Sequence, residues 1–355
     1  MEWHQLYFSG SAVSISPLSI GDDTVDKGEE IKNRIESNIN FYPWYDSLNI
    51  EDEKLYIEIC EAIDSFSEDK IYVGEYSSYG DMNKRIEEIS KIYWKLRYEQ
   101  PDYFWADWYD SEYIKNEDKY ALYIKLNFVE DKDTCLLMKE EYDSVVERVV
   151  SMAKVKPTLY DKVLYVYDYI LENTEYYYEL SEGTVDYALG YTSYACLIEG
   201  KTVCSGYASA FASIMNKLGI ECGYEFDMFS GYSFISGGHV WNYCKLDDEY
   251  YYFDLTWDDT TFDDVSYLPY IEYSYMYFGV TKTEIEKSHN SIHQDTITPL
   301  CNGTKYNYFV YNNYSFSEYD FDEVKHALIR QSGNKCVAIR FDSTTETQKA
   351  VDDLF

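Results

Sequence analysis

A cysteine at the start of a helix of small residues is the feature that most constrains this chain. Cys204 follows a loop that ends near Gly200, and residues 205–219 have the composition of a closely packed helix that Gly219 ends. Unpaired N–H groups and the helix dipole favour a thiolate at such a position. Taken alone, a cysteine in an alanine-rich helix is more often a packed apolar residue. A reactive thiol therefore requires a base nearby.

His239 is the best candidate for that base among five histidines. It follows two glycines and begins a strand-like run to Leu246, and a backbone without side chains lets a substrate approach closely. The other histidines have weaker settings. They lie in the leader, in a polar stretch and on a predicted surface helix: His4, His289, His293 and His326.

Asp254 lies on the next strand-like run, residues 250–257. With a two-residue hairpin loop, residues that face each other have an odd index sum, and 239 and 254 add to 493. We therefore expect the two side chains to emerge on one face of the sheet as direct or diagonal neighbours. A carboxylate placed there accepts the ring N–H, fixes the tautomer and stabilises the imidazolium.

The order of these residues resembles the bacterial transglutaminase-like superfamily. Three segments carry the resemblance: Gly200-Lys-Thr-Val-Cys204-x-Gly206-Tyr207-Ala208, Gly238-His239-Val-Trp241-Asn242 and Tyr251-Tyr-Phe-Asp254-Leu-Thr256-Trp257-Asp258-Asp259. The match runs from about Leu159 to Asp259, and looser similarity continues through Tyr277-Phe278 and His289. It implies an α+β, papain-like fold in which the nucleophile helix packs on an antiparallel sheet that supplies His and Asp.

The resemblance implies roles for single residues: Cys204 as nucleophile, His239 as base and Asp254 as the residue that orients it. Ser205 stands where many relatives carry an acidic residue, which would alter substrate preference. An oxyanion hole needs a second donor besides the Cys204 N–H, and the Tyr194 hydroxyl is our candidate, with a merely packed tyrosine as the alternative. Trp241 falls on the same strand face as His239 and is expected to wall the cleft.

Two functions fit this pattern. Members of the superfamily include protein cross-linkers, peptidases, de-N-glycosylating amidases and proteins that lost the triad. The first expectation is cysteine-dependent acyl transfer or amide hydrolysis on a protein, peptide or peptidoglycan-type cell-wall substrate, with hydrolysis favoured because water needs no dedicated site. The alternative is a non-catalytic module that binds a peptide or glycan through tyrosine-rich flanks. The 42 tyrosines suit that use, or they reflect codon bias alone.

Charge and cysteine usage exclude several partners and groups. The net charge is −35 and no basic stripe offsets it, so we expect no nucleic-acid partner, whereas cationic peptides are compatible. Eight cysteines without a CxxC pair argue against a zinc ribbon. The acidic positions 258, 259, 263 and 264 do not match an EF-hand, so we expect a solvated acidic loop, no metal and no cofactor.

The chain divides into four expected parts. Residues 1–30 read as a flexible leader, 31–155 as an α+β domain, 156–300 as the transglutaminase-like core and 301–355 as a small α/β unit. No signal peptide and no stretch of about 18 apolar residues is visible, so the default location is cytoplasmic, although relatives are often exported.

The C-terminal unit resembles a second copy of an earlier segment. Shifting residues 58–90 by 265 positions lays them over 323–355 without a gap, and both segments predict helix–strand–helix. Identity is low, so chance with a shared periodicity is the alternative. A true repeat would leave the last helix unfinished at Phe355 and would make the chain a truncated fragment.

Overall fold

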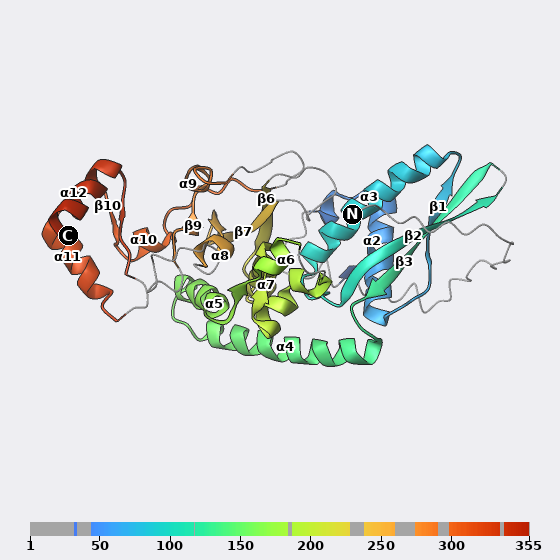
Figure 1. Ribbon diagram of the computed structural model, residues 1–355, viewed down its shortest axis with the longest axis horizontal. Coiled ribbons are helices and arrows are strands. Elements are labelled where there is room, and N and C mark those ends of the chain that lie inside the picture. The colour runs from blue at the N-terminus through green and yellow to red at the C-terminus, as the bar shows by residue number, and fades with distance from the viewer. Residues whose placement is uncertain are drawn as a thin grey trace. The chain divides into compact units, whose positions relative to one another are not determined.

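The computed structural model describes residues 32–33, 44–116, 118–183, 187–227, 238–259, 274–289, 298–333 and 337–354. The chain forms two compact units (Figure 1). Among the described residues, the first unit holds 32–33, 44–97 and 105–132, and the second holds 98–104 and 133–354. The predicted leader and His4 lie outside the described residues.

The first unit is a three-stranded antiparallel sheet with two helices. The elements are η1 (Tyr45–Ser47), α2 (Ile50–Ser65), β1 (Ile71–Tyr76), α3 (Tyr79–Glu99), β2 (Ala106–Asn116) and β3 (Lys119–Phe128), with strand order β1-β3-β2. The Asn49 side chain caps α2 by accepting the N–H groups of Glu51 and Asp52. Apolar residues alternate along 120–128 in the sequence, as in a half-buried strand, and Leu122, Ile124 and Leu126 of β3 are buried.

Three long helices belong to the second unit or extend into it. They are α4 (Lys132–Lys154), α5 (Leu159–Asn173) and α7 (Cys204–Lys217). The Thr158 side chain caps α5, and the apolar residues Val163, Val166 and Ile170, which recur at helical spacing, are fully buried. Nearly all of α4 clusters with the second unit. The compact units thus separate near Lys132, whereas we expected a domain boundary after residue 155; the four-part division stays a prediction.

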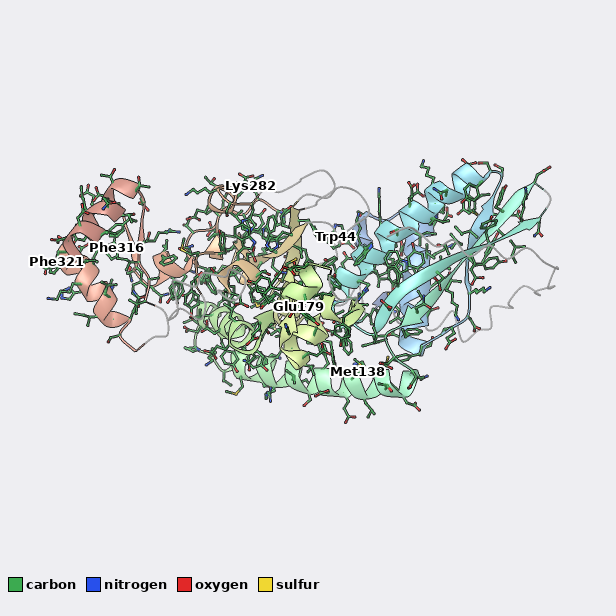
Figure 2. The ribbon with its side chains drawn as sticks, viewed as in Figure 1. Trp44, Met138, Glu179, Lys282, Phe316 and Phe321 are labelled. Atoms are coloured by element: carbon green, nitrogen blue, oxygen red, sulfur yellow. The ribbon has the colours of Figure 1, made fainter. Side chains whose placement is uncertain are left out.

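A four-stranded antiparallel sheet carries the second unit. Its order is β6 (Cys222–Asp227), β7 (His239–Leu246), β8 (Glu249–Phe253) and β9 (Phe278–Val280). Helices α5 and α7 lie against one face of this sheet (Figure 1). Phe253 packs there on Phe211 of α7 and Tyr167 of α5, and Asn242 donates to the Ala208 carbonyl. The other face is covered around Trp241 by Ile285 and Cys301, within a core dense in aromatic side chains (Figure 2).

The last residues of the expected strand 250–257 form a helical turn instead. Strand β8 ends at Phe253, and α8 (Leu255–Asp258) follows with Asp254 as its N-cap. Asp254 Oδ1 accepts the Trp257 N–H at 3.1 Å. In a strand, this N–H would have needed an acceptor on a neighbouring strand. The expectation of a strand through Trp257 is therefore wrong, because the side chain of Asp254 caps a helix.

The remaining elements are short, apart from two C-terminal helices. They are β4 (Glu175–Tyr176), α6 (Tyr178–Ser181), η2 (Ala188–Tyr191), the π-helical turn η3 (Ala195–Glu199), β5 (Lys201–Thr202), α9 (Lys282–Ile285), α10 (Tyr308–Tyr311), β10 (Ser315–Phe316), α11 (Phe321–Arg330), β11 (Arg340–Phe341) and α12 (Thr344–Leu354).

The bounds of the elements in the two segments of the expected repeat can be compared. Helices α2 and α11 end 265 positions apart, at Ser65 and Arg330, and α3 and α12 begin 265 positions apart, at Tyr79 and Thr344. The strands pair differently, because β1 runs antiparallel to β3 whereas β11 runs parallel to β10. That the two segments superpose stays a prediction.

The C-terminal unit also contacts the core. Arg340 Nη1 lies 2.7 Å from Glu284 Oε1 of α9, and Asn312 Nδ2 lies 2.6 Å from the Tyr160 hydroxyl of α5. Phe316, which Figure 2 labels, packs on Phe341 across the two parallel strands.

The fold class is α+β, as the sequence predicts. Helices and antiparallel sheets occur in both units, and α7 packs on the central sheet of the second. Within the part of the chain that the structure describes, no helix has an apolar run that could cross a bilayer.

Candidate active site

Cys204 is the first residue of α7 and is partly exposed. Val203 is the N-cap and offers no side-chain hydrogen bond, so the first turn of the helix receives no side-chain cap from it. The other six cysteines in the described residues are buried: Cys60, Cys135, Cys196, Cys222, Cys244 and Cys301. Cys204 therefore combines a helix start with access to solvent.

Gly206 fixes how closely the start of α7 approaches its surroundings. A Cβ at this position would lie 1.8 Å from Thr202 Oγ1 and 2.8 Å from the Thr192 carbonyl oxygen. Thr202 in turn donates to the Gly190 carbonyl at 2.7 Å. The glycine of the Cys-x-Gly pattern thus allows the nucleophile helix to begin against the loop before it.

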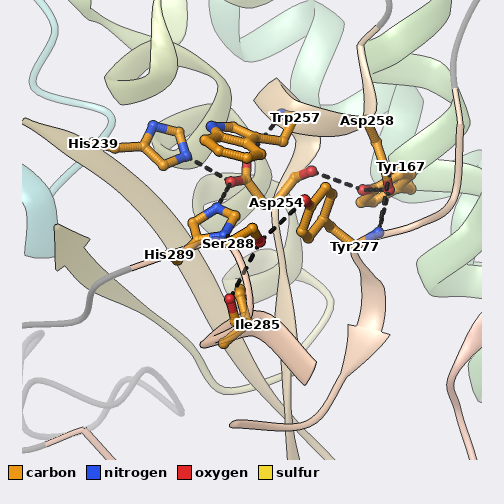
Figure 3. A network of polar contacts seen from close by, with 9 residues as sticks. All are labelled: Tyr167, His239, Asp254, Trp257, Asp258, Tyr277, Ile285, Ser288 and His289. Carbon is orange, nitrogen blue, oxygen red and sulfur yellow. Dashed lines mark hydrogen bonds and ion pairs between the residues drawn. The ribbon is translucent and has the colours of Figure 1, made fainter. Parts of the chain in front are cut away.

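The structure brings His239 and Asp254 together, as expected. His239 Nε2 lies 2.6 Å from Asp254 Oδ2 (Figure 3). Leu246 faces Glu249 across a two-residue turn, so position 254 extends the register to face 241, and His239 is its diagonal neighbour. Because Nε2 faces the carboxylate, Nδ1 is the ring nitrogen left for Cys204, whose side chain is close enough to perturb the His239 pKa.

The charges of the site stabilise one another. Burial opposes a charged His239 ring, but Asp254 and the neighbouring Cys204 side chain outweigh it and raise the His239 pKa to about 10. Burial likewise opposes a charged Asp254, and the imidazoles of His239 and His289 hold the pKa of that carboxyl well below its usual range. At neutral pH the histidine is therefore an imidazolium and the aspartate a carboxylate.

His289 is a fourth member that we discounted because it lies in a polar stretch. Its side chain is fully buried, and Nε2 lies 2.8 Å from Asp254 Oδ2, the same oxygen that His239 contacts (Figure 3). The other ring nitrogen, Nδ1, lies 2.8 Å from Ser288 Oγ. The sequence did hold a signal, since the looser family similarity extends as far as His289.

Two tryptophans enclose the imidazoles. Measured between ring centroids, Trp241 stacks on His239 at 5.6 Å and meets His289 edge-on at 4.8 Å. The Trp257 ring centroid lies 4.3 Å from that of His289 and 5.8 Å from that of His239. Trp241 shares the strand face of His239, as expected, but it is 1% exposed. It therefore supports the histidines from within the core and does not wall an open cleft.

Tyr194 has partners elsewhere. Its hydroxyl donates to Glu141 Oε2 of α4 at 3.3 Å, and its ring packs on Phe104. The proton of this hydroxyl is thus given to Glu141, and the role of Tyr194 as the second oxyanion donor stays a prediction. Burial, and then the charge of the Cys204 side chain, raise the pKa of Tyr176 to about 12, and the Tyr176 hydroxyl donates to Ser181 Oγ at 3.1 Å. Ser205 Oγ donates to the Tyr191 carbonyl.

The expected solvated acidic loop is wrong for Asp258 and Asp259, which are 0% and 3% exposed. Asp258 accepts the hydroxyls of Tyr167 at 2.5 Å and Ser274 at 2.6 Å, and Asp259 accepts the hydroxyl of Tyr207. These bonds tie α8 to α5 and α7, so both carboxylates serve as buried anchors. Residues 263 and 264 lie outside the described residues.

Donor atoms of His239, Asp254 and His289 lie within 4.8 Å of one another, a spacing that a metal ion could use. The same atoms already form the two N–H to carboxylate bonds. The hydrogen bonds account for the cluster, and we interpret it as a network without a metal.

Comparison with known proteins points to one superfamily. Residues 146–255 match the model of the transglutaminase-like superfamily, whose members are in general cysteine-dependent enzymes. No curated protein matches the sequence.

Two solved structures are similar to parts of the chain. One is a TGase with 16% identity and a TM-score of 0.28, covering 41% of this chain and 44% of its own. The other is a Cytophaga hutchinsonii protein provisionally named a cysteine protease, with 12% identity and a TM-score of 0.26, covering 53% of this chain and 67% of its own. The chain thus spans less than half the length of the TGase. Both TM-scores are below 0.5, so neither structure supports an argument about this fold.

Proposed function

Because residues 146–255 form a transglutaminase-like segment, we propose that Cys204, His239 and Asp254 act as a catalytic triad for acyl transfer from an amide. One observation carries the proposal. A partly exposed thiol at a helix start lies beside an imidazole that a buried carboxylate holds at 2.6 Å. This is the arrangement that makes and keeps a thiolate–imidazolium pair.

In the proposed reaction, the Cys204 thiolate attacks the carbonyl carbon of the substrate amide and forms a carbon–sulfur bond. The tetrahedral intermediate collapses, the carbon–nitrogen bond breaks, and the proton on His239 Nδ1 passes to the leaving amine. His239 then takes a proton from water or from an acceptor amine, which attacks the thioester. The acid or new amide leaves, and the thiolate–imidazolium pair is restored.

Asp254 serves this cycle without changing its own protonation. Its carboxylate stays charged in the buried site because the imidazoles stabilise it, so it holds the Nε2–H of His239 and leaves Nδ1 toward the thiol. The Cys204 N–H is one donor for the oxyanion. Tyr194 stays our candidate for the second donor.

We propose a protein, peptide or cell-wall peptide as the substrate, with water as the preferred acceptor. A chain with a net charge of −35 attracts cationic and amine-rich partners. The alternative is a non-catalytic binding module that uses the same scaffold. A protein that only binds has no need of a buried carboxylate whose charge two histidines stabilise. This network therefore favours the enzyme.

Alkylation by iodoacetamide at about pH 6 tests the proposal, because only a thiolate held by an imidazolium reacts fast there. We expect Cys204 to be labelled at least tenfold faster than any other cysteine, and His239→Ala to abolish that preference. Cys244, buried in β7, is the internal control. Uniform labelling, or labelling that ignores His239, would leave only the binding module.

A further inference from the structure

Asp254 holds more donors than a catalytic aspartate requires. Oδ1 accepts the Trp257 N–H at 3.1 Å, and Oδ2 accepts from both His239 at 2.6 Å and His289 at 2.8 Å. His239 is the base of the chemistry proposed above, whereas His289 transfers no proton in it and has so far only been said to help keep Asp254 charged. A buried histidine on the same oxygen as the base is close enough to affect the reaction.

The hydrogen bonds determine the protonation of His289. Asp254 is a carboxylate and only accepts, so His289 Nε2 carries a hydrogen. On the other side, Ser288 Oγ accepts from the Tyr277 hydroxyl at 3.1 Å and has one proton to give. Its two acceptors are His289 Nδ1 at 2.8 Å and the Ile285 carbonyl at 3.3 Å, and the shorter bond favours Nδ1. With that bond, Nδ1 of His289 accepts from Ser288 and Nε2 carries the ring hydrogen.

These bonds form a chain with one direction (Figure 3). Tyr277 donates to Ser288, Ser288 to His289, and His289 to Asp254, where the bond from His239 arrives from the other side. The ionisable groups that face the His289 ring among the described residues are Asp254, His239 and Tyr277. Trp257 and Trp241 pack against the ring and restrict its rotation.

We propose that His289 is a positioning residue of this site: as the neutral Nε2–H tautomer set by Ser288, it fixes the Asp254 carboxylate against His239. The inference rests on the proposed function. A buried carboxylate with one donor fewer would turn or admit water, and the imidazolium would lose its fixed partner. The neutral ring also draws charge from Oδ2 and so limits how strongly Asp254 stabilises the protonated His239.

Two substitutions separate positioning from packing. In His289→Gln the amide nitrogen stands near the place of Nε2 and keeps the donor, whereas His289→Leu keeps a side chain of similar bulk without it. We expect the alkylation rate of Cys204 to fall about tenfold or more in His289→Leu and to stay within about threefold in His289→Gln. The pH midpoint of alkylation should move in the leucine variant alone, which a packing role would not cause.

Equal rates and midpoints in the two variants, with wild-type circular dichroism, would overturn the proposal. If the leucine variant does not fold, ¹⁵N NMR of histidine-labelled wild type decides, because the chain has only five histidines and His289→Gln assigns the signal. A neutral ring protonated at Nε2 is expected, and protonation at Nδ1 would refute the chain of donors. Absence of selective Cys204 labelling in the wild type would instead refute the proposed function and leave the tautomer result standing.

Discussion

Asp254 and Asp258 stand at the two ends of the one-turn helix α8, and both are buried, with exposures of 1% and 0%. Their partners differ. Asp254 faces two imidazoles, while Asp258 accepts two hydroxyls and the Tyr277 N–H. The surroundings of the two carboxyls therefore match in burial and differ in the charge of the donors.

The difference in donors separates their pKa values. At Asp258, burial raises the pKa to about 7, and the neutral donors and backbone N–H oppose it only in part. At Asp254, the same burial is outweighed by His239, so the pKa falls well below its usual range. A buried carboxylate thus stays charged when a cation faces it, whereas neutral hydrogen bonds alone leave it near its titration point.

The largest expected effect is on the alkylation rate of Cys204 when Asp254 loses its charge. Asp254→Asn should slow the alkylation of Cys204 at about pH 6 by about 100-fold or more, because an amide cannot stabilise the imidazolium. Asp258→Asn, the matched control four residues on, should change it less than about tenfold. Similar rates in the two variants would show that the carboxylates share one role.

The next effect is on stability against pH. The folded-state pKa of Asp258, about 7, exceeds its ordinary value of 3.8, so its contribution to stability is complete below that ordinary value and is lost as the pH rises through about 7. Asp254 has the opposite sign: its contribution is present above 3.8 and is lost as the pH falls. Denaturant titrations between about pH 5 and about pH 8 should therefore show a smaller loss of stability in Asp258→Asn than in the wild type. An unchanged slope would contradict the raised pKa.

A smaller effect, on stability, is expected at Tyr167, whose hydroxyl contacts both aspartate residues. The Tyr167 hydroxyl contacts Asp258 Oδ2 at 2.5 Å and the Asp254 carbonyl oxygen at 3.1 Å. Tyr167→Phe should lower the free energy of unfolding by about 1–3 kcal/mol, because Asp258 Oδ2 loses the shorter of its two buried donors. Tyr165→Phe, on the same helix with a less buried side chain, is the control and should cost under about 0.5 kcal/mol.

The smallest effect belongs to Ser274. Its hydroxyl donates to Asp258 Oδ1 at 2.6 Å, but that oxygen also accepts the Tyr277 N–H at 3.2 Å. Ser274→Ala should therefore cost about 1 kcal/mol, measured by urea unfolding at a pH below the midpoint of Asp258. If Ser274→Ala lowered the free energy of unfolding more than Tyr167→Phe does, Ser274 would be the more important of the two donors to Asp258.

Several features of the site were predictable from the sequence. The 3.6-residue rhythm of α5 and the alternation of β3 indicate which residues are buried, because a single face of each element meets the core. The odd index sum of His239 and Asp254 predicts a shared face, since the turn at Asp247 holds two residues and strand side chains alternate. These features depend only on positions close along the chain.

The predictions that failed did so for two reasons. The strand expected through Trp257 ended early for a local reason, since the Asp254 side chain caps α8. The acidic residues 258 and 259 are buried because Tyr167 and Tyr207, far away in the sequence, donate hydrogen bonds to them. The sequence does not show whether the hydroxyl of a tyrosine or the carboxylate of an aspartate forms its hydrogen bonds with water or with a buried partner.

The sequence by itself determined the α+β class, the helix that begins at Cys204 and the pairing of His239 with Asp254, because period, caps and turn length act within a few residues. Only the tertiary structure decided that His289, 35 positions from Asp254, shares its oxygen, and that Asp258 is neutralised in part by burial. Whether a buried polar group is charged depends on the donors that folding brings to it, and no local pattern encodes that meeting.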